Sequence, residues 1–198
     1  MFEKDVERLQ RRIQNNKGKE IVFYGSSSIR LWVSMEEDLA PFSTLRLGFG
    51  GSTFEWLNYY FESIFKDIEP RHVIVYAGDN DMSNGCSPGQ IRDQFNELQD
   101  KLNDLYSSIE IHGITIKPSP HRKRYLEQII ETNHLLKEAL TSEGKSRQIN
   151  IFDPMLKNGE PRPELFKSDG LHMNRKGYEI WSQEVFAYLQ KKMGHKPH

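Results

Sequence analysis

Residues 72–81 of the chain read HVIVYAGDND, and this stretch decides the fold class. It opens with an apolar run rich in β-branched and aromatic residues, and it ends in a glycine followed by polar side chains. An apolar run bounded in this way is typical of a strand that is buried on both faces of a parallel sheet. The same design occurs earlier in residues 20–28, EIVFYGSSS, and in residues 44–52, TLRLGFGGS. Each apolar part is therefore predicted to be a strand, and each glycine-rich part is predicted to be the loop that leaves it.

Helical segments alternate with strands along the rest of the chain. The clearest one follows residue 87, because apolar side chains recur there at intervals of four and three residues from Ile91 to Leu105. Ser87 and Gln90 have the spacing of a capping box at its start. The predicted strands are residues 20–24, 44–47, 72–76, 109–116 and 149–152, and the predicted helices are residues 5–14, a stretch from 30, 53–65, 88–105, 122–140 and 175–192. This alternation predicts an α/β fold, a three-layer α/β/α sandwich around a five-stranded parallel sheet.

Length and composition exclude several classes of protein. The chain has 198 residues, which predicts a single domain over residues 1–198. Its 27 lysines and arginines nearly balance 28 acidic residues, so the net charge of −1 offers no attraction for nucleic acid. Cys86 is the only cysteine, which excludes an intrachain disulfide and a cysteine-rich zinc site. The first residues lack the apolar segment of a secretory signal, and no apolar run approaches the ~20 residues of a membrane span. We therefore expect a cytoplasmic protein without a nucleic-acid partner.

Polar, glycine-rich loops follow three consecutive predicted strands. In open α/β sheets ligands bind beyond the carboxyl ends of the strands, so GSSS, GFGGS and GDND are expected to line one pocket. Ser27, in GSSS, lies at a strand-to-helix turn, where free backbone N–H groups and the helix dipole favour a developing negative charge. A serine there is a candidate nucleophile, and the alternative is that it only caps the helix.

A second candidate group precedes the last predicted helix, in residues 168–172, SDGLH. Asp169 can reach the imidazole of His172 across one turn, fix its tautomer and stabilise the imidazolium, while the other ring nitrogen faces a nucleophile. The alternative is an ordinary turn with a histidine on the surface. The order Ser…Asp…His on an α/β frame favours the catalytic interpretation, because several serine hydrolases have it.

Candidate donors for an oxyanion lie in the other two loops. Hydrolysis through a tetrahedral intermediate needs hydrogen-bond donors aimed at the developing negative oxygen. Gly51 can supply a backbone N–H and Asn80 a side-chain amide, and the alternatives are a tight turn at Gly51 and a helix cap at Asn80. Residues 117–122, KPSPHR, follow the fourth strand and are expected at the same edge, as a pocket wall or as a rigid turn.

In this order, four blocks of the chain resemble the SGNH (GDSL-like) hydrolase family. The blocks are IVFYGSSSIRLW, RLGFGGS, AGDND and SDGLHMNRKGY, and the resemblance spans nearly the whole chain, from Ile21 to the last helix. It is closest to the compact lysophospholipase-like and platelet-activating-factor acetylhydrolase-like branch, and it implies a flavodoxin-like fold. Ser26 departs from the pattern, because the family commonly has aspartate there. Counted from the preceding glycine, the resemblance places the nucleophile at Ser27, ahead of Ser26 and Ser28.

The resemblance implies a serine esterase that acts on a small-molecule ester. Ser27 is then the nucleophile, His172 the base and Asp169 the residue that orients it. The N–H groups of Ser27 and Gly51 and the amide of Asn80 form the oxyanion hole. We expect short acyl chains, because the chain has no long insertion to form a lid. The implied reaction needs no metal and no organic cofactor, and a homodimer is compatible with the resemblance.

Two other functions fit parts of the sequence. A metal-dependent hydrolase is disfavoured, because the seven histidines include no HExxH pair. Residues 79–90 begin like a calcium loop, but Gly85 is one place late and Gln90 stands where a glutamate is needed. A non-catalytic phosphate- or ligand-binding module fits the GSSS turn, but it leaves Asp169 and His172 without a role.

Overall fold

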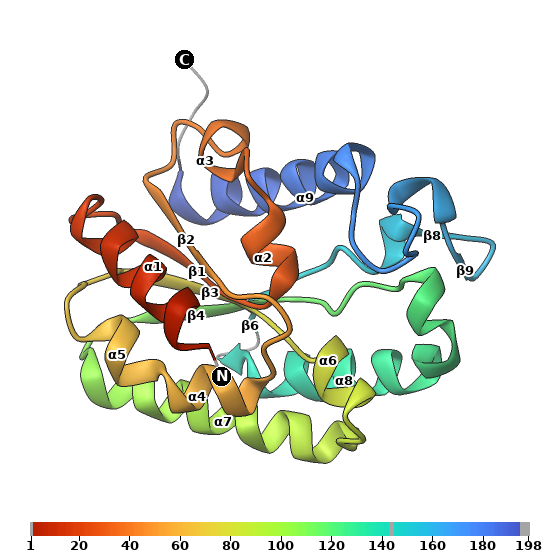
Figure 1. The fold of residues 1–198 in the computed structure, drawn as a ribbon, viewed down its shortest axis with the longest axis horizontal. Helices are drawn as coiled ribbons and strands as arrows, with labels where there is room; N and C mark the ends of the chain where they lie inside the picture. Colours follow the sequence, from red (N-terminus) through yellow and green to blue (C-terminus); the bar gives the residue numbers. More distant parts are fainter. Residues whose placement is uncertain (1, 143–144, 195–198) are drawn as a thin grey trace.

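Five parallel strands form the central sheet of the structure, a computed structural model that describes residues 2–142 and 145–194 (Figure 1). The strands are β1 Ile21–Gly25, β2 Thr44–Gly48, β3 His72–Tyr76, β4 Glu110–Ile114 and β7 Gln148–Ile149. Their order is β2-β1-β3-β4-β7, and every neighbouring pair is parallel. This is the strand order of flavodoxin-like folds. The predicted five-stranded parallel sheet is therefore confirmed.

Helices cover both faces of the sheet (Figure 1). One layer contains α2 Ser27–Leu31, α3 Met35–Asp38 and α9 Arg175–Met193, and the other contains α1 Glu3–Gln14, α4 Phe54–Tyr59, α5 Phe61–Phe65, α7 Pro88–Leu105 and α8 Leu126–Ala139. Successive residues of a strand point to opposite faces, so each strand contributes to two hydrophobic cores. In β1, Val22 and Tyr24 lie in the core with α7, while Ile21 and Phe23 lie in the core with α9. This two-sided burial is the reason why the strands read as continuous apolar runs.

Some helix boundaries differ from the prediction. α7 begins with the predicted capping box at Ser87. The predicted helix over residues 53–65 is wrong in its middle, because α4 and α5 are separate helices that meet at Tyr60. The predicted helix over residues 122–140 begins as the 3-10 helix Pro120–Tyr125 and is α-helical only in α8. α2 begins at Ser27, three residues before the predicted stretch.

The fifth strand is shorter than predicted, because side chains replace its backbone partners. The Thr115 hydroxyl accepts hydrogen bonds from the N–H groups of Ile151 and Phe152 at 2.9 and 3.0 Å. The chain therefore leaves the ladder after Ile149 and turns into the 3-10 helix Asp153–Met155. Two short hairpins were not predicted: β5 Thr141–Ser142 with β6 Lys145–Ser146, and β8 Leu156–Lys157 with β9 Glu160–Pro161. Among the described residues, no helix has the length and apolar character needed to cross a membrane.

Candidate active site

Three glycine-rich loops leave the sheet side by side. Gly25, the last residue of β1, is paired in register with Gly48 of β2 and with Tyr76 of β3. The N–H of Phe49 donates to the Gly25 carbonyl at 3.1 Å, and the N–H of Ser26 donates to the Tyr76 carbonyl at 3.0 Å. The predicted loops after the first three strands therefore begin at one edge of the sheet.

Close backbone approach explains two of the glycines at this edge. A Cβ on Gly25 would lie 2.1 Å from the Tyr76 carbonyl oxygen, and a Cβ on Gly48 would lie 2.4 Å from the Arg30 nitrogen. A side chain at either position would separate a strand from its neighbour or from α2. The two glycines thus allow α2 to begin directly at the strand ends, which sets the position of Ser27.

Among the three consecutive serines, Ser27 is the most accessible. Ser26, Ser27 and Ser28 are 0, 8 and 3% exposed. Ser26 holds the N-cap position of α2 without a side-chain capping bond, and its buried hydroxyl has no hydrogen-bond partner among the residues described. The carbonyl of Ser28 accepts a hydrogen bond from the Tyr178 hydroxyl at 2.9 Å. Ser27, the first residue of α2, is therefore the serine best placed to meet a ligand.

The two candidate oxyanion donors come from neighbouring loops. Asn80 lies in α6 Asp79–Ser83, and its Nδ2 donates to the carbonyl of Ser52 at 3.1 Å. An amide group carries two hydrogens, and this bond uses one of them. Gly51 precedes Ser52 and has φ +78°, a left-handed conformation that favours glycine. Asn80 and Gly51 are thus brought to the same place by contacts between the loops after β2 and β3.

Asp169 and His172 form the contact that their spacing predicts. Asp169 Oδ2 lies 2.7 Å from His172 Nδ1, and Asp169 Oδ1 accepts the N–H groups of Leu171 and His172, both at 2.9 Å. The hydrogen bond from His172, aided by the two backbone N–H groups, lowers the pKa of Asp169 far below its usual value. Asp169 is therefore ionised at neutral pH. With Nδ1 bonded to the carboxylate, Nε2 of His172 is the nitrogen left for other chemistry.

Two contacts place the loop of Asp169 and His172 at the edge where the strands end. The N–H of His121, in the segment after β4, donates to the Gly170 carbonyl at 3.0 Å. The hydroxyl of Tyr178, in α9, donates to the carbonyl of Ser28, the residue after Ser27. Within the described part of the chain, no hydrogen bond joins the Ser27 hydroxyl to the His172 imidazole. Such bonds are often long in unliganded enzymes and shorten when substrate binds.

Residues 21–180 of the chain match the GDSL-like Lipase/Acylhydrolase family. The chain belongs to this family. Membership in the GDSL-like family makes it an enzyme that hydrolyses esters. A comparison with curated proteins gives no match.

Solved structures with the same fold include several GDSL-like proteins. A Streptococcus pneumoniae protein described as a candidate platelet activating factor has a TM-score of 0.82 at 19% identity, over 94% of this chain and 92% of that one. A GDSL-like lipase from Bacteroides thetaiotaomicron has a TM-score of 0.73 at 20% identity, over 96% of each chain. An acetyl xylan esterase has a TM-score of 0.67 at 19% identity, over 85% of this chain and 98% of that one. At these identities the likeness concerns the fold.

A buried ion pair lies beside the site of this GDSL-like chain, and the sequence did not reveal it. Lys117 Nζ lies 2.5 Å from Asp79 Oδ2 and 3.2 Å from the Tyr76 hydroxyl. The side chains of Lys117 and Asp79 are 2 and 4% exposed. Burial raises the pKa of Asp79, but the Lys117 ammonium more than offsets this effect and holds that pKa below its usual value. The pair fixes the first residue of α6, next to Asn80.

Asp81 is a second buried carboxyl group in the same loop. Its Oδ1 accepts the N–H of Phe54 at 2.9 Å, which joins α6 to the start of α4. Asp81 is 0% exposed, and its Oδ2 has no hydrogen-bond partner among the described residues. Burial raises the pKa of Asp81 to about 7. The predicted strand-end position of Asp81 carried no signal of this burial, which involves the contact with the start of α4.

Proposed function

We propose that the chain hydrolyses small-molecule carboxylic esters with short acyl chains through a covalent acyl-enzyme on Ser27. The observation that carries this proposal is the 2.7 Å contact between Asp169 and His172, at the edge of the sheet where Ser27 begins α2. The three residues occur in the chain order of several serine hydrolases. Membership in the GDSL-like family supplies the reaction class.

In the first half of the reaction, the Ser27 oxygen attacks the ester carbonyl carbon and its proton passes to Nε2 of His172. The carbonyl π electrons move to oxygen and form the tetrahedral intermediate. When the intermediate collapses, the alcohol leaves with the proton from His172. Asp169 stays ionised and stabilises the imidazolium during this step.

In the second half, water takes the place of the alcohol. His172 removes a proton from water as the water oxygen attacks the acyl carbon, and it returns the proton to Ser27 when the acid leaves. The N–H groups of Ser27 and Gly51 and the second amide hydrogen of Asn80 stabilise both oxyanions. A donor of this kind contributes about 10²–10³-fold in kcat.

A short acyl group suits the short loops that carry the two proposed oxyanion donors, Gly51 and Asn80. Only residues 49–53 separate β2 from α4, and only Ala77 and Gly78 separate β3 from α6. Lids over active sites are usually long loops, commonly above about 12 residues. The likeness to an acetyl xylan esterase, an enzyme of acetyl esters by its name, points in the same direction.

The test measures initial rates on p-nitrophenyl acetate, butyrate and octanoate for the wild type and three variants. Ser27→Ala should lose hydrolysis, whereas the matched Ser26→Ala and Ser28→Ala variants should retain it. Circular dichroism shows that each variant is folded. Activity that survives in Ser27→Ala and disappears in a neighbour would reassign the nucleophile. If the wild type hydrolyses the octanoate ester faster than the acetate and butyrate esters, the proposed preference for short acyl chains is wrong. If the wild type hydrolyses none of the three esters, a ligand-binding role is favoured.

A further inference from the structure

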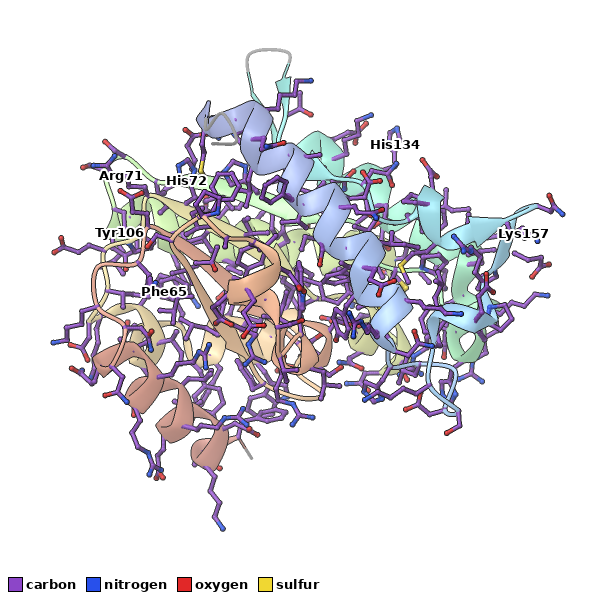
Figure 2. The ribbon with its side chains drawn as sticks, turned by 90° about the horizontal axis from the view of Figure 1, so that it is seen from above. Phe65, Arg71, His72, Tyr106, His134 and Lys157 are labelled. Carbon is purple, nitrogen blue, oxygen red and sulfur yellow. The ribbon has the colours of Figure 1, made fainter. Side chains whose placement is uncertain are left out.

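A second cluster of titratable side chains lies at the opposite edge of the sheet, where β3 and β4 begin. His72 is the first residue of β3 and Glu110 the first of β4, and the two are paired in register. His112 lies two residues after Glu110, so the three side chains point to the same face of the sheet. Figure 2 labels His72 at this edge, next to Arg71. The proposed ester site lies at the other ends of these strands.

The three side chains converge as metal ligands do. His72 Nδ1 lies 3.2 Å from His112 Nε2, and one ligand atom from each of the three residues lies within 4.8 Å of the others. Two imidazole nitrogens bound to a tetrahedral zinc ion, each at about 2.0–2.1 Å, lie about 3.3 Å apart. The separation of the two ring nitrogens therefore matches that of two ligands of one ion. The Glu110 side chain has to turn toward the histidines, and it is 44% exposed.

A hydroxyl group from α9 orients the buried histidine. His112 Nδ1 lies 2.8 Å from the Tyr188 hydroxyl, and His112 is only 1% exposed. When Nδ1 carries the hydrogen and donates it to Tyr188, Nε2 presents a lone pair toward His72. Histidines that bind metal ions almost always donate their other ring N–H in this way, which fixes the tautomer and the ring orientation.

The charge state of the cluster also suits a cation. Burial lowers the pKa of His112 to about 3 and lowers the pKa of His72, so both rings are neutral at pH 7. Neutral imidazole is the form that binds metal. The cations near the cluster are Arg71, which lies next to His72, and Arg147 and Lys192, each 3.9 Å from Glu110, too far for a short charged hydrogen bond. These contacts are loose enough for the carboxylate to turn toward an ion.

We propose that His72, His112 and Glu110 bind a divalent transition-metal ion of the zinc type. Two imidazoles and one carboxylate favour zinc over magnesium or calcium, which prefer ligand sets made of oxygen. Three protein ligands leave a fourth position for water. The ion joins β3 to β4 and, through Tyr188, to α9, so its role is to stabilise the fold. The site is independent of ester hydrolysis.

The test is a titration of the chelator-treated protein with zinc, followed by calorimetry, and with cobalt, followed by its visible absorption. All proteins carry His195→Ala and His198→Ala, because these two histidines are close in sequence and would compete for the added metal. Zinc should raise the melting temperature of this background. His72→Ala should abolish both this increase and the absorption of tetrahedral cobalt. Tyr188→Phe keeps all three ligands, and its affinity should fall about 10- to 100-fold.

His134→Ala is the matched control. His134 is an exposed histidine whose Nδ1 lies 3.5 Å from the Glu138 carboxylate, outside the cluster, and its removal should leave zinc affinity unchanged. Hydrolysis by His72→Ala should equal that of its background, which separates this proposal from that of the ester site. The proposal is overturned when the background shows no saturable zinc binding, or when His72→Ala and His134→Ala bind zinc equally well. In that case the two rings form only a hydrogen bond.

Discussion

Replacing Lys117 by methionine tests the buried ion pair beside the proposed site. The change keeps most of the side-chain volume and removes the ammonium, which lies 2.5 Å from Asp79 Oδ2. The other carboxylate oxygen of Asp79 is buried, and it has no hydrogen-bond partner among the residues described. Asp79 cannot easily turn toward water, because its side chain is only 4% exposed. The variant therefore contains an uncompensated buried charge.

The expected loss of unfolding free energy is about 3–5 kcal/mol at pH 7, the usual cost of breaking a buried pair from one side. In the wild type, Lys117 holds the pKa of Asp79 below its unfolded value, so the stability that this group contributes is lost as the pH falls through that lowered pKa. In Lys117→Met, only the weaker effects of Arg122 and the Asn80 N–H still oppose burial, so we expect the pKa of Asp79 to rise above its unfolded value. The variant is therefore stabilised as the carboxyl takes up a proton. The difference in unfolding free energy between the wild type and Lys117→Met should therefore become smaller from pH 7 to pH 5.

Urea unfolding followed by fluorescence of the three tryptophans measures this gap. Lys101→Met is the matched control, because Lys101 forms a 2.7 Å pair with Glu97 in which the side chains are 36 and 54% exposed. That surface ion pair should contribute about 0.3–0.5 kcal/mol to the unfolding free energy. The double variant Lys117→Met/Asp79→Asn should recover most of the loss. Three results would refute the reasoning. Lys117→Met could lose less than about 1 kcal/mol of unfolding free energy, or the losses of Lys117→Met and Asp79→Asn could simply add in the double variant. The difference in unfolding free energy between Lys117→Met and the wild type could also grow from pH 7 to pH 5.

Three further predictions concern the loops at this edge. Asp169→Asn should lower kcat on p-nitrophenyl acetate by up to about 10⁴-fold, because an amide favours the wrong tautomer of His172; unchanged kcat would remove Asp169 from the proposed triad. Asn80→Ala should lower kcat by about 10²–10³-fold with little change in KM, and a change in KM alone would indicate a role in ground-state binding. Asp81→Asn should resist urea better than the wild type above pH 7, where the buried carboxyl is ionised at a cost, because the pKa of Asp81 is about 7. This advantage should shrink at pH 5 and vanish only below about pH 4, where the carboxyl of the unfolded chain is protonated too. An advantage equal at pH 5 and above pH 7 would show that ionisation of Asp81 is not its cause.

Local patterns predicted the frame of the molecule well. The apolar runs of β1 and β3 and the capping box of α7 depend on neighbours in the chain, and each lies where the sequence placed it. The contact between Asp169 and His172 was predictable for the same reason, because the two residues are three positions apart in the chain. The break between α4 and α5 was not predictable, since the apolar spacing continues through Tyr60.

The sequence by itself determined the α/β class, the two-sided burial of the strands and the candidate residues of the ester site. Which serine is accessible was decided only by the tertiary structure, through α2 beginning over Gly25 and Gly48. The pairing of Lys117 with Asp79, and of His72 with His112, was decided there as well. These pairs join the beginnings or the ends of different strands, and their distances depend on the register between strands remote in sequence. Register follows from the packing of the whole sheet against its helices, and no local pattern of residues contains it.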